Sequence, residues 1–273
     1  MVSGTLECNV LRPDFPESWL QPDWPAPTRV RAVMTDRHGG VSAAPYDSLN
    51  LGDHVCDQVA SVLANRAILA EAVGRRPVFL QQVHGVDCVT LGATTPDGVA
   101  ADACMSTTAD VACTIMVADC LPVLLCDASG TWVAAAHAGW RGLAGQGGVG
   151  VLEALIASLS PMADRRADIL AWLGPCIGPQ AFEVGPEVRA AFCTTDASAE
   201  ACFVPHADGK FLADLPGLAR RRLQQLGITQ IFGNDSQPAW CTALQASRFF
   251  SHRRDSRVLG QSGRMAACIW LEP

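Results

Sequence analysis

Three apolar segments follow one another in the middle of the chain, separated by little more than a turn. They are VACTIMVADC (111–120), LPVLLCD (121–127) and TWVAAAHAG (131–139). Short apolar runs that are rich in β-branched residues and bounded by turn residues indicate buried β-strands. We therefore expect these three segments to form strands in the core of the fold.

The rest of the chain mixes helical and strand-like patterns without a regular alternation. Helix periodicity predicts helices at 57–74 and 148–159 and in the segments PEVRAAF and LPGLARRRLQQLG. Strands are expected at 29–35, 77–85, 86–92 and 168–175. Three further segments, ITQIFG, SRFFSHRR and GRMAACIWLE, are expected to be strands or strand ends. Strands outnumber helices, which favours a mixed α/β fold with two packed sheets over a doubly wound parallel sheet.

Length and charge limit the organisation and the partners. The chain has 273 residues, of which 49% are hydrophobic, and no linker or charge run divides it, so we expect one domain spanning 1–273. A net charge of −7 argues against a general nucleic-acid or membrane-surface binder. The local basic run Arg220–Arg222 lies in a predicted helix and is expected to be a solvated face.

The 12 cysteines are more typical of core residues than of a disulfide framework. Cys126 and Cys268 lie inside apolar runs, where free cysteine packs as a small hydrophobic residue. The sequence contains no C-x-x-C motif, its first residues lack the pattern of a signal peptide, and no apolar run reaches the roughly 20 residues that span a bilayer. We therefore expect a reduced, cytoplasmic protein that does not bind membranes.

Three possible metal ligands stand at the ends of apolar runs. They are His84 in QQVHG, Cys120 in VADCLP and His137 in AAAHAGWRG. If buried strands end together, their side chains converge at one sheet edge. Two imidazoles and one thiolate suit Zn²⁺ and leave a fourth position open, as in catalytic zinc sites. The alternative from spacing alone is one core cysteine and two hydrogen-bonded turn histidines.

Two other chemistries fit parts of the same residue set. Copper in a His₂Cys site needs a weak axial ligand, for which Met105 or Met116 is available. A thiol nucleophile, either Cys120 or Cys241, paired with a histidine would make a cysteine hydrolase. Because Cys120 cannot be both a permanent metal ligand and a free nucleophile, these interpretations exclude one another.

Signals for an anionic ligand are weaker. GQGGVG (145–150) matches G-x-G-x-x-G, but it begins well beyond the end of the preceding predicted strand, so we expect its glycines to allow close packing instead of binding a dinucleotide. Arginine forks match phosphate oxygens, but each candidate taken alone fits an ordinary surface arginine better. The candidates are Arg66, Arg141, Arg248, Arg253 and Arg254.

A series of motifs runs in order from about residue 29 to the C-terminus: TDRHGGVS, YDSLNLGDH, NR (65–66), QQVHG, ADA (101–103), ADCLPVLL, AAAHAGWRGL, GPCIGPQAFEVG, FFSHRRD and GRMAACIWL. Together they resemble the laccase-domain family, once named multicopper polyphenol oxidoreductases and now associated with zinc-dependent purine nucleoside phosphorylase activity. HAGWRG together with ADCxP and QVHG is the most specific part. One departure is Cys56, in GDHVCDQ, where the family usually shows glycine.

The resemblance implies a four-layer α/β/β/α fold with mixed sheets. It places the family's metal ligands at His84, Cys120 and His137. It places segments that line the same pocket, and hence the expected substrate contacts, at Asn50, Arg66 and Cys241. The implied reactions are phosphorolysis of adenosine, inosine and methylthioadenosine to free base and ribose 1-phosphate, and deamination of adenosine, with a nucleoside and phosphate as the bound partners.

The chemical roles are only partly assigned by these motifs. Arg66 is the candidate to hold phosphate as positive charge develops at C1′. The chain lacks the H-x-E and P-C-x-x-C motifs of nucleobase deaminases, so its general acid/base is not identified beyond Asp119, which precedes Cys120. Three alternatives stay open: an amidase that edits a cell-wall precursor, a copper-dependent polyphenol oxidase and a zinc-stabilised binding module.

Overall fold

A four-stranded sheet forms one half of the core. The computed structural model describes residues 15–160 and 165–273. The order of strands in this sheet is β1 (Val30–Met34), β13 (Met265–Leu271), β5 (Val111–Val117) and β2 (Arg76–Phe79). β2 runs parallel to β5, and the other pairs are antiparallel. Every residue of β5 and β13 is buried, as their continuous apolar sequences predict.

A six-stranded sheet forms the other half. Its order is β12 (Gln230–Gly233), β8 (Ile169–Leu173), β6 (Leu121–Asp127), β7 (Val133–Ala138), β4 (Ala103–Ser106) and β3 (Cys88–Thr90). The pairs β12–β8 and β3–β4 are parallel, whereas β6 and β7 pair antiparallel, so this sheet is mixed too. The predicted central strands β5, β6 and β7 are confirmed, and they divide between the two sheets.

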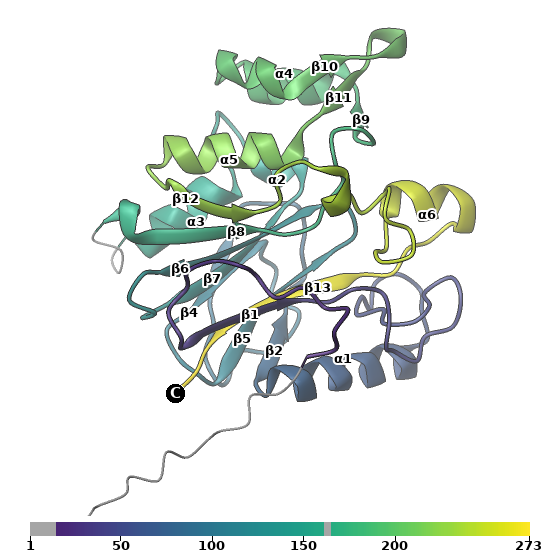
Figure 1. The fold of residues 1–273 in the computed structure, drawn as a ribbon, viewed down its shortest axis with the longest axis vertical. Coiled ribbons are helices and arrows are strands. Elements are labelled where there is room, and N and C mark those ends of the chain that lie inside the picture. The colour runs from purple at the N-terminus through teal and green to yellow at the C-terminus, as the bar shows by residue number, and fades with distance from the viewer. Residues whose placement is uncertain (1–14, 161–164) are drawn as a thin grey trace, which may run out of the picture.

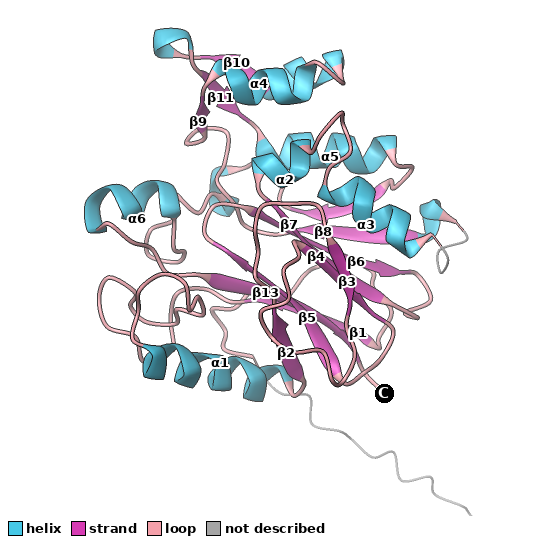
Figure 2. Cartoon of the chain, turned by 180° about the vertical axis from the view of Figure 1, so that it is seen from behind, coloured by secondary structure: helices cyan, strands magenta, loops and turns pink. Residues whose placement is uncertain are grey.

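Helices cover the outer faces of the two sheets (Figures 1 and 2). α1 (Val59–Val73) lies on the four-stranded sheet, and its Leu69 and Val73 pack with Phe79, Met116 and Trp270. The six-stranded sheet is covered by α2 (Trp140–Ala144), α3 (Val151–Leu159) and α5 (Leu215–Gln225). The expected four-layer α/β/β/α arrangement with mixed sheets is thus confirmed.

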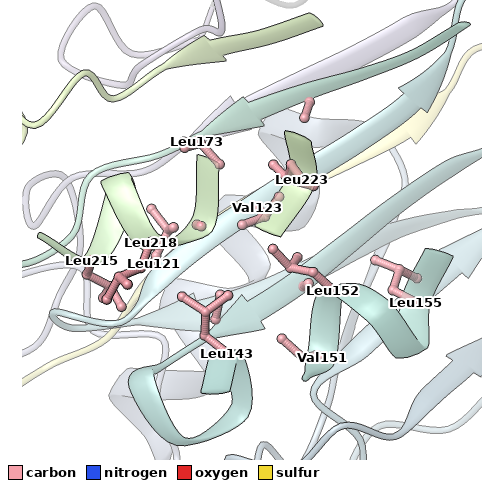
Figure 3. Packing of buried hydrophobic residues seen from close by; sticks show 14 of the residues in the cluster. Leu121, Val123, Leu143, Val151, Leu152, Leu155, Leu173, Leu215, Leu218 and Leu223 are labelled. Atoms are coloured by element: carbon pink, nitrogen blue, oxygen red, sulfur yellow. The ribbon is translucent and has the colours of Figure 1, made fainter. Parts of the chain in front are cut away.

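Figure 3 shows how the outer helices close the core of the six-stranded sheet. Leu152 of α3 and Leu218 of α5 lie over Val123 of β6 and Leu173 of β8. All four side chains are at most 2% exposed. A separate layer of buried residues lies between the two sheets and includes Ile115 of β5 and Leu124 of β6. Because alternate side chains of one strand point to opposite faces, β6 contributes to both layers.

A small three-stranded sheet at one end was not expected from the sequence. It consists of β10 (Phe203–Pro205), β11 (Phe211–Ala213) and β9 (Glu183–Val184), with α4 (Pro186–Cys193) beside it, on the side away from α1 (Figure 1). These strands are too short to show the alternation by which strands are recognised. Short 3₁₀ helices occur at Arg166–Asp168, Ala197–Cys202, Ala207–Gly209 and Pro238–Trp240.

The strand expected in SRFFSHRR is wrong. Phe249 and Phe250 are fully buried, but they lie in a loop that leads into α6 (His252–Leu259). Ser251 is the N-cap of this helix, and its hydroxyl accepts a hydrogen bond from the backbone of Arg254. The serine cap therefore starts a helix where aromatic residues had suggested an extended strand.

The solvated face expected for the basic run of α5 is also wrong. The Arg222 side chain is buried, contacts the carbonyl of Gly148 and pairs with Glu153 at 3.2 Å. Arg220 donates to the carbonyls of Ile231, Gly233 and Asn234. These arginines stabilise the contact of α5 with the chain around it, because each guanidinium donates to backbone carbonyls of neighbouring segments.

Every cysteine in the described residues is a free thiol, which agrees with the expectation that they form no disulfide framework. Cys126 and Cys268 are buried as predicted, whereas Cys56 is exposed. No helix in the described part of the chain is long and apolar enough to cross a membrane.

Candidate metal centre and its pocket

The three candidate metal ligands lie together in the structure. One ligand atom from each of His84, Cys120 and His137 is within 4.8 Å of the others. The Sγ atom of Cys120 lies 3.7 Å from Nε2 of His84. A cluster of two imidazoles and one thiol at this spacing could hold a metal ion, so the expected convergence is observed.

The route by which these residues meet differs from the expected one. The strand predicted at 77–85 ends at Phe79, so His84 lies in a loop beyond β2. Cys120 lies in the turn between β5 and β6, and His137 lies inside β7. Because β5 and β6 belong to different sheets, the turn that carries Cys120 crosses from one sheet to the other. The cluster therefore forms where the two sheets meet.

The loop around His84 is held by a buried carboxylate. Asp102 is fully buried and accepts hydrogen bonds from the backbone N–H groups of Val83, His84 and Gly85 at 3.1, 3.0 and 2.7 Å. His84 itself has φ of 60°, in the left-handed region that non-glycine residues rarely adopt. Three convergent backbone donors thus stabilise a conformation that the local sequence does not favour.

The same carboxylate orients the second histidine. Oδ1 of Asp102 lies 2.8 Å from Nδ1 of His137, and the Asp102 carbonyl accepts the His137 backbone N–H at 2.7 Å. With Nδ1 engaged in this way, Nε2 is the nitrogen left to bind a metal. Burial raises the pKa of Asp102, but hydrogen bonds from His137 and from the backbone outweigh it, so the pKa lies below its usual value.

Asp102 was not assigned a role from the sequence, although it lies in one of the segments that carry the family resemblance. Its only local signal is a carboxylate between two alanines, Ala101 and Ala103, in a stretch that is otherwise buried. An acidic residue with apolar neighbours on both sides needs buried donors, and here the donors come from the histidine loop and from β7.

The glycines of HAGWRG are required by space. A Cβ atom at Gly139 would lie 2.9 Å from Sγ of Cys120 and 2.9 Å from Cδ2 of His84. A Cβ atom at Gly142 would lie 2.9 Å from the carbonyl oxygen of Gly85. The φ of Gly139 is −65°, which any residue adopts, so close approach and not backbone freedom explains this glycine. The Gly139 backbone therefore forms a wall directly against the ligand cluster.

Cys120 and His137 influence each other's protonation. Burial raises the pKa of the Cys120 thiol, but the charge of His137 and hydrogen bonds from both histidines lower it to about 6. Burial lowers the pKa of His137, whereas the Cys120 thiolate and Asp102 raise it to about 9. This pairing favours the thiolate of Cys120, which is the form of cysteine that binds metals.

A pocket of about 780 Å³ opens over the cluster, a size typical of sites for small molecules. Its lining includes an apolar side, by which we mean Trp140, Ile177, Phe182 and Leu215, all part of one hydrophobic cluster. It also includes a basic side, by which we mean His54, Arg66, His252 and Arg264. Two further arginines of the lining lie over aromatic rings, Arg141 over Trp140 and Arg253 over Phe182. The His–Cys–His cluster lines the same pocket, so a bound molecule can contact apolar, basic and metal-binding groups.

The three expected substrate contacts lie in different positions. Arg66 lines the pocket, with Nε donating to the carbonyl of Leu51 at 3.0 Å, an ion pair to Asp53 at 3.2 Å and its guanidinium 4.0 Å from the Phe79 ring centre. Asn50 and Cys241 are buried and are not among the residues that line the pocket. Their contact with substrate stays a prediction.

Asn50 nevertheless reaches the pocket through a neighbour. Its Oδ1 accepts the backbone N–H groups of Gly52 and Arg264, the latter at 2.9 Å, and its Nδ2 donates to Asp57. Cys241 acts on another segment, since its Sγ accepts the backbone N–H of Gly178 at 3.1 Å. Both side chains position backbone near the pocket.

Asp119, the candidate acid/base, is tied into a network of donors. Its carboxylate accepts hydrogen bonds from the hydroxyls of Thr242 and Ser251 and from the backbone N–H of Arg253. Its φ is 83°, again in the left-handed region. In this arrangement Asp119 anchors the turn that carries Cys120 to the beginning of α6.

The remaining sequence motifs have simpler roles. A Cβ atom at Gly145 would lie 1.8 Å from the Val149 carbonyl oxygen, and one at Gly150 would lie 2.2 Å from that of Leu143. The glycine-rich segment therefore allows close packing before α3, as expected. Cys56 has φ of 66°, so it occupies a conformation that favours glycine.

Comparisons of the sequence and of the structure with known proteins point to the same family. The family model for multi-copper polyphenol oxidoreductase laccase matches residues 31–272. A purine nucleoside phosphorylase from Pseudomonas aeruginosa is 53% identical over 257 residues, covering 93% of this chain and 99% of that protein. The purine nucleoside phosphorylase YfiH from Escherichia coli is 50% identical over 254 residues, covering 92% and 98%.

Solved structures show the same fold. A protein from Neisseria meningitidis has a TM-score of 0.83 and 45% sequence identity, covering 94% of this chain and 100% of that chain. The protein YlmD from Geobacillus stearothermophilus has a TM-score of 0.77 and 30% identity, covering 90% and 93%.

Proposed function

Because this chain belongs to the multi-copper polyphenol oxidoreductase laccase family, we propose that it acts as a purine nucleoside phosphorylase, the activity for which its curated relatives are named. The observation that carries the proposal is the pocket over the His–Cys–His cluster, which has an apolar side and a basic side. The two substrates of a phosphorylase match these two groups of residues. The faces of a purine are flat and largely apolar, whereas phosphate is an anion that basic groups bind.

The reaction is a transfer of the ribosyl group. A phosphate oxygen forms a bond to C1′ of the nucleoside while the C1′–N9 bond breaks. The electron pair of that bond leaves with the purine, which takes up a proton originally carried by phosphate, so the products are free base and ribose 1-phosphate. Positive charge develops at C1′ during the exchange, and an anion held beside it stabilises that charge.

We propose that different residues of the pocket contact different parts of the substrates. Trp140 and Phe182 supply aromatic surface against which a purine packs. Arg66 lines the basic side, and its guanidinium is oriented by Leu51 and Asp53, so we propose it as a contact for the ribose. Asn50 and Cys241 support the backbone near the pocket, so their effect on the substrate is expected to be indirect.

Zn²⁺ is the metal we propose for the cluster, with His84, Cys120 and His137 as its ligands. Two imidazoles and a thiolate are donors that zinc prefers, and the Asp102–His137 contact is the support expected around such a ligand. When bound, the metal would supply Lewis-acid chemistry to a substrate in the pocket.

Copper fits this environment less well. Sδ of Met116 lies 4.0 Å from Nη2 of Arg66, and Met105 packs in the core between the six-stranded sheet and its helices. Although Met116 lines the same pocket as the cluster, its sulfur lies against a cation, so we assign neither methionine as the axial ligand that a His₂Cys copper site needs.

The range of reactions is part of the proposal. We propose adenosine, inosine and methylthioadenosine as substrates for phosphorolysis, and adenosine also for deamination to inosine. The test is to incubate zinc-loaded protein with adenosine, with and without phosphate, and to identify the products. Adenine and ribose 1-phosphate are expected only with phosphate, and inosine in both cases. Zinc-loaded protein that yields none of these products contradicts the proposed function.

A cysteine-type hydrolase that edits a cell-wall precursor is the second candidate, because Sγ of Cys120 lies 3.7 Å from Nε2 of His84. A thiol with a nearby imidazole has the parts of a nucleophile and its base. Alkylation with iodoacetamide after removal of the metal separates the two. An amide hydrolase would be active without metal until Cys120 is alkylated, whereas activity that follows zinc content excludes it.

A further inference from the structure

We propose that Arg264 binds the phosphate that attacks the nucleoside, with His54 and His252 beside it on the basic side of the pocket. This inference rests on the proposed phosphorylase function and deepens it by assigning the subsite for the co-substrate. It also differs from the sequence-based expectation, which selected Arg66 for phosphate.

The guanidinium of Arg264 has N–H donors that no other described residue uses. Arg264 lines the pocket just before β13, and its Nη1 donates to the carbonyls of Ser262 and Gly263 at 2.8 and 3.1 Å. Among the residues that the structure describes, Nε and Nη2 have no hydrogen-bond partner, and no carboxylate forms an ion pair with this side chain. These two nitrogens form the edge of the fork that binds two oxygens of an oxyanion.

The stem of Arg264 is fixed before any ligand binds. A Cβ atom at Gly52 would lie 2.7 Å from Cγ of Arg264, so the loop of Gly52 packs tightly against the side chain. The backbone N–H of Arg264 donates to Oδ1 of Asn50 at 2.9 Å. A charged group held in place in this way loses little freedom when it binds an anion.

The other arginines of the pocket lie against a carboxylate or an aromatic ring. Arg66 is paired with Asp53 at 3.2 Å. Arg253 donates to the carbonyl of Ala181 at 3.3 Å, and its guanidinium lies 5.7 Å from the ring centre of Phe182, on the apolar side. Arg141 is exposed, with its guanidinium 4.5 Å from the ring centre of Trp140, also on the apolar side. Arg264 combines partial burial with unused donors away from these rings, and a partly desolvated cation gains more from an anion than an exposed one does.

Two imidazoles, His54 and His252, line the same pocket as Arg264, and we assign them to the same subsite. Nδ1 of His54 lies 3.5 Å from Oδ1 of Asp53, which leaves its Nε2 for a ligand. Burial lowers the pKa of both imidazoles, and the charge of Arg264 lowers it further, so these rings are neutral and can donate an N–H. The His–Cys–His cluster lines this pocket too, so phosphate bound at Arg264 shares the pocket with the cluster.

The test compares Arg264→Gln with Arg66→Gln in zinc-loaded protein, with Arg257→Gln, an exposed position on α6 that does not line the pocket, as the control. Phosphate KM and nucleoside KM are measured in phosphorolysis. Binding of inorganic phosphate is measured separately by broadening of its ³¹P resonance, which requires no turnover. Arg264→Gln is expected to raise the phosphate KM and Kd about 10- to 100-fold and to change the nucleoside KM by less than about threefold.

The conservative variant Arg264→Lys keeps the charge without the fork and is expected to recover part of the phosphate affinity. It also serves as the test if Arg264→Gln does not fold. Phosphate KM and Kd within about twofold of the unmodified protein, or a larger loss in Arg66→Gln than in Arg264→Gln, would overturn the assignment. If the unmodified protein makes no ribose 1-phosphate but binds phosphate through Arg264, the subsite stands and the proposed reaction fails.

Discussion

Asp102 holds His137 and the loop of His84 with one carboxylate. Its Oδ1 lies 2.8 Å from Nδ1 of His137 and 3.0 Å from the backbone nitrogen of His84. The two histidines come from different parts of the fold, one from a loop and one from β7, and this buried carboxylate sets their relative position. The geometry of the proposed metal site therefore depends on a residue that does not itself join the His–Cys–His cluster.

Replacement of Asp102 by asparagine should weaken zinc binding about 10- to 100-fold, because the amide is a poorer partner for Nδ1 and cannot accept all of the backbone N–H bonds. Competition with a chromophoric chelator measures the affinity. Asp110→Asn, at an exposed position just before β5, is the control. Zinc affinity equal to that of the control would remove Asp102 from the site.

Replacement of the ligands themselves should remove metal and activity together. His137→Ala and Cys120→Ser each leave two ligands, so we expect the zinc content to fall from about one per chain to a small fraction, and turnover to fall by at least about 100-fold. Metal analysis of the purified variants and product assays on the same samples provide the comparison. Full activity in a zinc-free variant would show that the ligand assignment is wrong.

Gly139→Ala should disturb the cluster although it adds a single methyl group. The new Cβ would lie 2.9 Å from Sγ of Cys120, so the thiol or the His84 ring must move. We expect at least a tenfold loss of zinc affinity and about 1–3 kcal/mol lower stability to unfolding. Gly92→Ala is a matched control, because its Cβ has no neighbour within 4 Å and its φ is not positive. Equal behaviour of the two variants in denaturant titration and zinc competition would contradict this account.

Cys56→Gly should stabilise the protein. Cys56 has φ of 66°, a conformation that costs an L-residue about 1–2 kcal/mol, and the greater freedom of glycine in the unfolded chain offsets part of the gain. The expected net increase in the free energy of unfolding is about 0.5–1 kcal/mol, with unchanged zinc content. Cys56→Ala keeps the Cβ atom and should give no such gain; if alanine stabilises as much as glycine in urea denaturation, backbone strain is not the cause.

Removal of the metal should lower the melting temperature without unfolding the chain at room temperature. The three buried hydrophobic clusters are large, and of the three proposed ligands only Cys120 packs against one of them, so we expect the core to persist without the metal. Binding of zinc to the folded state adds about 4 kcal/mol when free zinc is about 1,000 times its Kd. Far-ultraviolet circular dichroism with and without a chelator tests this, and loss of the folded signal on chelation at about 25 °C would instead indicate a zinc-stabilised binding module.

Local patterns predicted much of the fold, since hydrophobic periodicity reports burial directly. The strands β5, β6 and β7 and the helix α3 follow from their apolar residues, and the motifs around Cys120 and His137 point to the ligand cluster. The patterns failed where a cap or a distant partner decided the structure. Ser251 started α6 in a segment that looked extended, and Glu153 with backbone carbonyls buried Arg222.

The sequence by itself determined which residue types are available for chemistry and which segments must be buried. Only the tertiary structure decided how they work together. Asp102 and His137 are 35 positions apart, and Asn50 meets Arg264 across 214 positions, so no local pattern reports either contact. Burial of a strand or helix can be predicted from the spacing of apolar residues along the chain. The partner of a buried charge cannot, because it depends on which loops the packed sheets bring together.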